Sequence, residues 1–247
     1  MSKTVFDYQK LESFAATLSE SYASARPFPH IVVDEFGERD RLAEALAVVP
    51  RPGDDIGWEE FDTPTEKKLA QNRIDRLPIA IVRVLEEMNA PPFLAFLERL
   101  TGITGLIADP DLIGGGLHQI VPGGFLGIHA DFNYHPKWRW DRRLNVLLFL
   151  NEGWQEEFGG HLELWDEKLS ASKRVLPVFN RMVCFSTTDV SFHGHPEPLC
   201  CPSERTRKSL ALYYYTKGRP RGERSFPHST LFQALPKGGG RGIISEP

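Results

Sequence analysis

The change in residue pattern near Thr101 constrains the fold of this chain more than any other feature. Beyond it, short apolar runs are separated by clusters of Gly, Pro, Asn and Asp: residues 117–121, 144–150, 161–165, 182–185 and 209–215. Such runs predict strands that end at turns. Many short strands are typical of a sandwich, barrel or jelly roll, in which closure or a second layer protects the strand edges. We therefore expect the second half to be all-β.

The N-terminal part has apolar residues at helical spacing instead. Residues 11–22 place Leu and aromatic side chains on one helical face, and the same pattern predicts further helices over residues 42–49, 79–88 and 93–100. Prolines break the last two helices apart, because proline lacks a backbone donor. Prolines followed by β-branched residues predict a short strand within 27–34, and the polar stretch 51–66 is expected to be a loop.

Composition and charge exclude several classes of protein. The 247 residues carry 29 Lys and Arg against 33 Asp and Glu, a net charge of −4, whereas a general nucleic-acid binder would carry a basic surface. No apolar stretch approaches the roughly 20 residues that span a bilayer, and residues 1–11 lack the apolar run of a secretory signal. We therefore expect a cytoplasmic protein without membrane or nucleic-acid partners. Three cysteines, an odd number, make a disulfide framework improbable.

The β half contains a pattern of metal-binding residues. His129 and Asp131 lie two residues apart, and in an extended strand such residues project to the same side. A second histidine, His193 of Ser191-Phe-His, follows 62 residues after Asp131. Two histidines and one carboxylate form the facial triad of non-haem Fe(II) oxygenases. His195 competes for the third position, because it lies on the same side of an extended chain as His193.

A second polar pattern begins 14 residues after His193. Arg207 and Ser209 open an apolar run and share one face by the period of two. A guanidinium forms forked, charge-assisted hydrogen bonds to a carboxylate, and a neighbouring hydroxyl can add another. These are the hydrogen bonds that binding the far carboxylate of 2-oxoglutarate requires.

The order of these motifs, HxD, Ser-Phe-His and then Arg-x-Ser, resembles the Fe(II)/2-oxoglutarate-dependent dioxygenases, and their prolyl 4-hydroxylase-like branch in particular. The resemblance extends over most of the chain, through residues 27–34, 142–151, 159–165 and 177–185. It implies a mainly β fold, a double-stranded β-helix or jelly-roll core with N-terminal helices. It also implies His129, Asp131 and His193 as iron ligands, since the family's distal ligand directly follows Ser-Phe or Ser-Trp.

By the same resemblance, Arg207 holds the far carboxylate of 2-oxoglutarate. One departure concerns Phe149, which stands where prolyl hydroxylases often place a tyrosine that helps to hold this co-substrate. Another polar group must then assist Arg207, and the candidates are Ser209, His118 and Asn145. The implied cofactors are Fe(II), 2-oxoglutarate and O2, with ascorbate as an optional reductant.

Three regions are expected from these observations. Residues 1–108 form a helical region with a first strand, packed on the barrel; residues 109–235 form the catalytic double-stranded β-helix; residues 236–247, rich in glycine, form a flexible tail. The segment 132–143 is expected to border the substrate entrance, because it directly follows a predicted metal ligand.

The resemblance implies hydroxylation of an unactivated C–H bond in a peptidyl substrate, for example a prolyl one, or in a small-molecule substrate, with release of succinate and CO2. Asp131 favours hydroxylation over halogenation, because iron halogenases leave a small residue at this position. The alternatives are a cupin-like metal-dependent isomerase or hydrolase, and a non-enzymatic jelly-roll binding module. The Arg207 and Ser209 pair argues against the first alternative, and the clustered metal-type ligands argue against the second.

Overall fold

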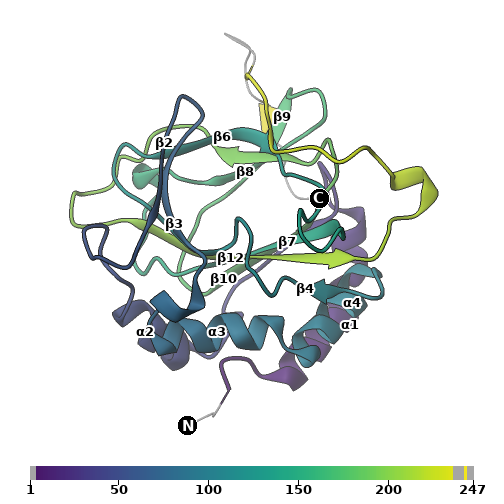
Figure 1. The fold of residues 1–247 in the computed structure, drawn as a ribbon, viewed down its shortest axis with the longest axis horizontal. Coiled ribbons are helices and arrows are strands. Elements are labelled where there is room, and N and C mark those ends of the chain that lie inside the picture. Colours follow the sequence, from purple (N-terminus) through teal and green to yellow (C-terminus); the bar gives the residue numbers. More distant parts are fainter. Residues whose placement is uncertain (1–3, 236–241, 244–247) are drawn as a thin grey trace.

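A computed structural model describes residues 4–235 and 242–243 of the chain. Its helices are α1 (Tyr8–Ser24), α2 (Arg39–Ala47), α3 (Ile79–Asn89) and α4 (Pro91–Thr101), with short 3-10 turns at Ile74–Arg76, Glu156–Phe158 and Arg221–Glu223. The four α-helices lie together on one side of the molecule, as Figure 1 shows. The expected tail lies outside the described residues, except for Gly242–Ile243.

The strands form two facing layers. One layer has the order β1 (His30–Val33), β10 (Arg181–Ser186), β7 (Asp141–Phe149), β12 (Arg207–Thr216) and β5 (Gly116–Ile120). The other has the order β6 (Phe125–Ala130), β11 (Phe192–His195), β8 (Leu162–Trp165), β9 (Ala171–Val175) and β14 (Gly242–Ile243). Strand β3 (Glu66–Gln71) pairs with β5 along one half and with β6 along the other, so it joins the two layers. This is the predicted jelly-roll barrel.

Shorter strands extend these layers at their edges. Strand β2 (Glu59–Asp62) pairs with β3, β4 (Ile107–Ala108) pairs with β12, and β13 (Leu231–Phe232) pairs with β6. The expectation of a loop over 51–66 is therefore wrong for β2 and for the start of β3. Strand β2 is polar and largely exposed, so its sequence carries no apolar alternation, and pairing with β3 makes it a strand.

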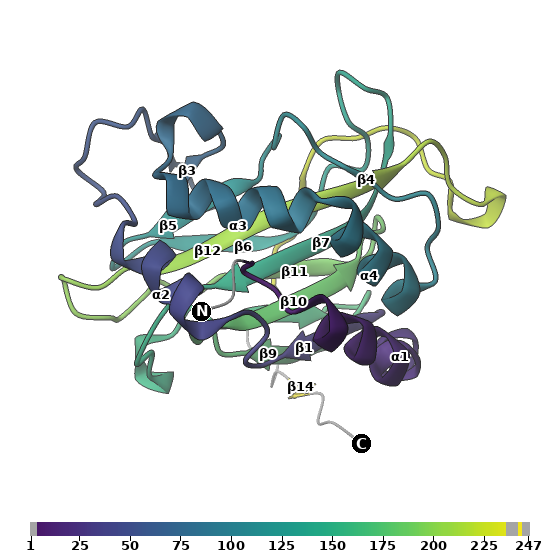
Figure 2. The same cartoon turned by 90° about the horizontal axis from the view of Figure 1, so that it is seen from below.

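The helices cover the outer face of the first layer. Helices α3 and α4 bury apolar side chains against it, and Ala90 separates the two helices at the predicted break, where α4 begins with Pro91. Gly102 directly follows helix α4 as its C-cap, and its φ of 72° is the left-handed conformation that glycine adopts without strain. Figure 2 shows α1 and α4 beside each other at one end of the molecule and α2 at the other.

The period of two along β12 places alternate residues in different cores. Leu210, Leu212 and Tyr214 pack against the helices, whereas Ala211 and Tyr213 point between the two layers. Because both faces of β12 are covered, the strand is apolar along most of its length. The inner face is where Arg207 and Ser209 also point, so the packing of the barrel directs these polar residues toward its interior.

Across the described residues, no helix combines the length and the apolar character that crossing a membrane requires.

Candidate metal and co-substrate site

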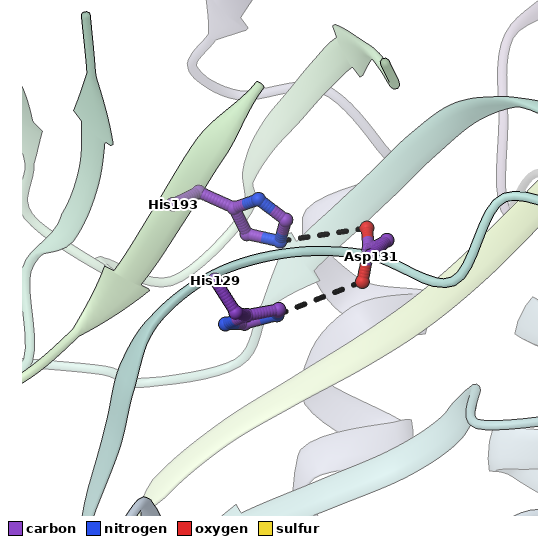
Figure 3. A group of neighbouring side chains, drawn as sticks. All are labelled: His129, Asp131 and His193. Carbon is purple, nitrogen blue, oxygen red and sulfur yellow. Dashed lines mark ion pairs between the residues drawn. The ribbon is translucent and has the colours of Figure 1, made fainter. Parts of the chain in front are cut away.

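Two strands bring three potential metal ligands together. His129 lies near the end of β6, Asp131 directly follows that strand, and His193 of β11 is the register partner of His129. The Nε2 atom of His129 lies 3.6 Å from Oδ1 of Asp131, and Nε2 of His193 lies 3.5 Å from Oδ2. Figure 3 shows both rings directed at the carboxylate between them. The three donor atoms lie within 4.8 Å of one another, close enough for one ion.

The other nitrogen of each imidazole is held by a backbone carbonyl. Nδ1 of His129 lies 2.8 Å from the Gly127 carbonyl oxygen, and Nδ1 of His193 lies 3.0 Å from the carbonyl oxygen of Ser191. A carbonyl only accepts, so Nδ1 carries the proton in both rings. Each Nε2 then presents a lone pair toward the centre of the group, as in histidines that ligate metals.

The charge states of the group also suit a divalent cation. Burial raises the pKa of Asp131, but the Arg142 cation and the two histidines outweigh it, so that the pKa lies well below its ordinary value. Burial lowers the pKa of His193 to about 4, partly offset by the Asp131 carboxylate. At neutral pH the group therefore offers an ionised carboxylate and a neutral imidazole, the forms that bind metals.

Arg142 is a residue of this candidate site that sequence reasoning missed. Its guanidinium is fully buried, donates from Nη2 to Oδ2 of Asp131 over 2.7 Å and lies between the rings of Phe132 and Tyr213. Asn145 donates to the same Oδ2 over 3.2 Å. These two donors orient the carboxylate and leave Oδ1 toward His129. The only sequence signal was an arginine at the start of a long apolar strand.

His129, Asp131 and His193 line a cavity of about 200 Å³ inside the barrel. Arg207 lies in the same cavity and is only 4% exposed. Its Nε donates to the Gly160 carbonyl oxygen over 2.7 Å, and its guanidinium lies over the Phe149 ring. No carboxylate of the described residues forms an ion pair with it, and burial lowers its pKa to about 9. A buried cation without a counter-ion fits an anionic ligand.

The residues predicted to assist Arg207 all line this cavity. Ser209 is the register partner of both Phe149 and His118, so the three side chains form one row across the inner face. His118 lies 3.1 Å from the Gly114 carbonyl oxygen through Nε2. Asn145 instead contacts Asp131, at the metal end of the cavity.

His195 lies apart from the three metal-type donors. The register of β11 against β6 shifts by one residue between His193 and His195, and His195 does not belong to the group of atoms that could share an ion. Burial, together with the nearby cations of Arg207 and Lys68, holds the pKa of His195 well below its ordinary value. The geometry therefore favours His193 over His195 for the third position.

A second cluster of metal-type side chains contains Asp109, Asp111 and His135. Nδ1 of His135 accepts hydrogen bonds from the backbone nitrogens of Lys137 and Trp138, and Nε2 then donates to Asp109 over 3.2 Å. Both ring nitrogens are engaged, so His135 has no lone pair for an ion. This cluster holds the loop after Asp131 in place.

The same loop was expected to border the substrate entrance. Phe132 lines the cavity, but Trp138 stacks on Trp140 and donates from Nε1 to Asp111 over 2.6 Å. Trp138 is 41% exposed, and the Lys137 ammonium lies 4.5 Å from the centre of its ring. A contact between this loop and substrate stays a prediction.

A jelly-roll barrel that carries two histidines and a carboxylate at one end of its cavity, and a buried arginine in the same cavity, defines the class of non-haem Fe(II) oxygenases that use 2-oxoglutarate. The comparisons agree, because residues 115–215 match the family model of the 2OG-Fe(II) oxygenase superfamily. This match runs from the start of β5 almost to the end of β12, and the name of the superfamily specifies Fe(II) and 2-oxoglutarate.

Relatives with named activities are similar over part or most of the chain. Prolyl 3-hydroxylase OGFOD1 of Mus musculus is 34% identical over 79 residues, which are 30% of this chain and 14% of that protein. A Pseudomonas putida prolyl-4-hydroxylase structure has a TM-score of 0.57 at 20% identity, over 83% of this chain and 100% of that one. A Trichoplax adhaerens prolyl hydroxylase, in complex with a peptide fragment of hypoxia inducible factor, has a TM-score of 0.58 at 16% identity, over 84% and 91%. The two structural likenesses establish the shared fold.

Proposed function

We propose that this chain is an Fe(II)- and 2-oxoglutarate-dependent dioxygenase that hydroxylates an unactivated C–H bond. The observation that carries the proposal is the pairing of two complementary sites in one cavity. Three metal-type donors lie within 4.8 Å of one another, and a buried arginine that pairs with no carboxylate of the described residues lines the same space. A dicarboxylic 2-oxo acid matches this pair, because it offers chelating oxygens at one end and a carboxylate at the other.

In this proposal His129, Asp131 and His193 hold the iron. Bound iron with 2-oxoglutarate and O2 supplies the oxidising chemistry, with release of succinate and CO2. Arg207 binds the far carboxylate of the co-substrate, with Ser209 and His118 as further donors in the same row. Arg142 and Asn145 orient Asp131 from outside the ligand group, and the apolar walls of the barrel limit access of water.

For the substrate we propose a peptidyl group, with proline as the first choice, and a small molecule as the alternative. The support is the named activity of the mouse relative and of the two prolyl hydroxylases with the same fold. Ascorbate is proposed only as a reductant that maintains Fe(II). The cytoplasmic location expected from the sequence stays a prediction.

Anaerobic titration of the Fe(II)-loaded protein with 2-oxoglutarate tests the proposal. We expect a weak visible charge-transfer band that saturates with the co-substrate, and oxygen-dependent succinate release when proline-containing peptides are added. A protein that binds Fe(II) but gives neither the band nor succinate would contradict the proposal and favour a cupin-like hydrolase or isomerase. A protein that binds neither ligand would favour the non-enzymatic binding module.

A further inference from the structure

His195 has no partner for either of its ring nitrogens among the described residues. Its side chain is 3% exposed, lies on the inner face of the barrel and lines the same cavity as Arg207. The other histidines of this cavity are different. His129, His193 and His118 each have one ring nitrogen within 3.1 Å of a backbone carbonyl oxygen. His195 is therefore the cavity histidine whose hydrogen-bonding capacity remains unused.

An unused buried donor points to a ligand. Native proteins pair nearly all their buried polar groups, and a polar atom left without a partner costs free energy. An imidazole has at least one N–H in either of its protonation states, so His195 always presents a donor to the cavity. The protein itself offers no acceptor to this donor in its described part.

The charges around His195 indicate which part of a ligand it contacts. Arg207 and Lys68 line the same cavity as His195. Lys68 is already paired with Glu66 at 2.7 Å, whereas Arg207 has no carboxylate partner among the described residues. One positive charge at this end of the cavity is therefore uncompensated, which suits a single carboxylate group.

We propose that His195 donates a hydrogen bond to the far carboxylate of 2-oxoglutarate, beside Arg207. The inference deepens the proposed function and rests on it. It also accounts for the absence of a hydroxyl at Phe149, whose ring lies under the Arg207 guanidinium. Phe149 and Arg207 lie on one layer of the barrel, and His195 lies on the other. A hydrogen bond across the barrel from β11 takes the place of a hydroxyl on β7.

The test measures binding of two ligands to the Fe(II)-loaded enzyme without oxygen. One ligand is 2-oxoglutarate and the other is 2-oxopentanoate, which has the same carbon chain and lacks the far carboxylate. In His195→Phe we expect the Kd of 2-oxoglutarate to rise about 10- to 100-fold, as expected for a lost hydrogen bond to a charged group. The Kd values of 2-oxopentanoate and of Fe(II) should stay within about threefold of the parent. His195→Gln, which keeps an N–H donor, should recover most of the lost affinity.

His228→Phe is the matched control, because His228 pairs with Asp189 and does not line the cavity. Melting curves show whether each variant is folded, and His195→Leu serves if the phenylalanine variant is not. An unchanged Kd for 2-oxoglutarate in both apolar variants would overturn the inference. So would an equal loss for both ligands, which would mean that His195 shapes the cavity or the metal site. If the parent itself binds no 2-oxoglutarate, the proposed function fails first.

Discussion

At the scale of single residues, two backbone carbonyls fix the orientation of the proposed histidine ligands. Gly127 and Ser191 each hold the Nδ1 proton of a histidine, so both Nε2 atoms face Asp131 before any ion arrives. Arg142 and Asn145 hold the carboxylate in the same way. Such contacts reduce the entropy that ordering the ligands would cost when the metal binds.

His193 and His195 should respond differently to substitution. His193→Ala removes a proposed ligand, so we expect it to lose Fe(II) binding and turnover together. His195→Ala should keep Fe(II) affinity near that of the parent and retain turnover at saturating 2-oxoglutarate, because His195 lies outside the group of metal-type donors. Equilibrium dialysis of Fe(II) under anaerobic conditions measures the difference. The reverse order of effects would show that the ligand assignment is wrong.

Arg207 should dominate affinity for the co-substrate. Removing one partner of a buried charged pair costs on the order of 2 to 5 kcal/mol, or roughly 30-fold to several-thousand-fold in affinity. We expect this range for the Kd of 2-oxoglutarate in Arg207→Ala. Arg207→Lys should lose less, since an ammonium keeps the charge but not the planar fork. A Kd for Arg207→Ala within about threefold of the parent would exclude the assigned role.

At the scale of elements, a C-terminal segment lies across the end of β6. Strand β13 pairs Phe232 with His129, and the two rings are 5.4 Å apart. Upstream of β13, Asn133 holds residues 225–228 through three hydrogen bonds, two donated by Nδ2 and one accepted from the His228 backbone nitrogen. One buried side chain thus ties this segment to the loop that follows Asp131.

Asn133→Ala should release residues 221–229 from the barrel. Because three hydrogen bonds are lost and backbone groups are left unpaired, we expect about 1 to 3 kcal/mol lower stability and faster tryptic cleavage after Arg221 and Arg224. Urea unfolding and timed proteolysis provide the measurements. Asn133→Asp, which keeps the acceptor for His228, should lie between the parent and the alanine variant. Equal proteolysis rates in all three proteins would contradict the role of Asn133.

At the scale of the whole molecule, the barrel encloses ionisable groups that favour folding only in one charge state. Burial and the Lys68 cation lower the pKa of His118 to about 3, and burial lowers that of His193 to about 4. The pKa of Asp131 is also depressed. The unfolded chain therefore binds more protons than the folded chain below about pH 6.5, so acid destabilises the metal-free protein.

The stability of the metal-free protein should fall as the pH decreases from about 6.5 toward 4. Each histidine kept neutral by the fold contributes a slope of up to about 1.4 kcal/mol per pH unit in this range. The free energy of unfolding in urea, measured at several pH values, gives this slope. His118→Asn should reduce this slope by up to about 1.4 kcal/mol per pH unit, the contribution of one proton. A slope that the substitution leaves unchanged would show that His118 does not stay neutral in the folded protein.

The sequence by itself determined the local patterns. Apolar runs broken by turn residues predicted the strands, and the period of two placed His129 with Asp131 and Arg207 with Ser209 on common faces. The choice of His193 over His195 came from the resemblance to the dioxygenases, whose distal ligand follows Ser-Phe, and the structure brings His193 beside His129. The strands and the shared faces are recoverable because each depends on neighbours within a few residues along the chain.

Only the tertiary structure decided the contacts between distant segments. Arg142 contacts Asp131 between the rings of Phe132 and Tyr213. Tyr213 lies on β12, about 70 residues after Arg142 in the chain. The register between β11 and β6 shifts by one residue between His193 and His195, so that only His193 lies beside His129 and Asp131, although the period of two left the two histidines equivalent in the sequence. Strand β3 joins the two layers by pairing with both β5 and β6. Its other partner, β2, has a polar sequence without a strand pattern. Local periodicity cannot encode such features, because they depend on which strands pair and in which register.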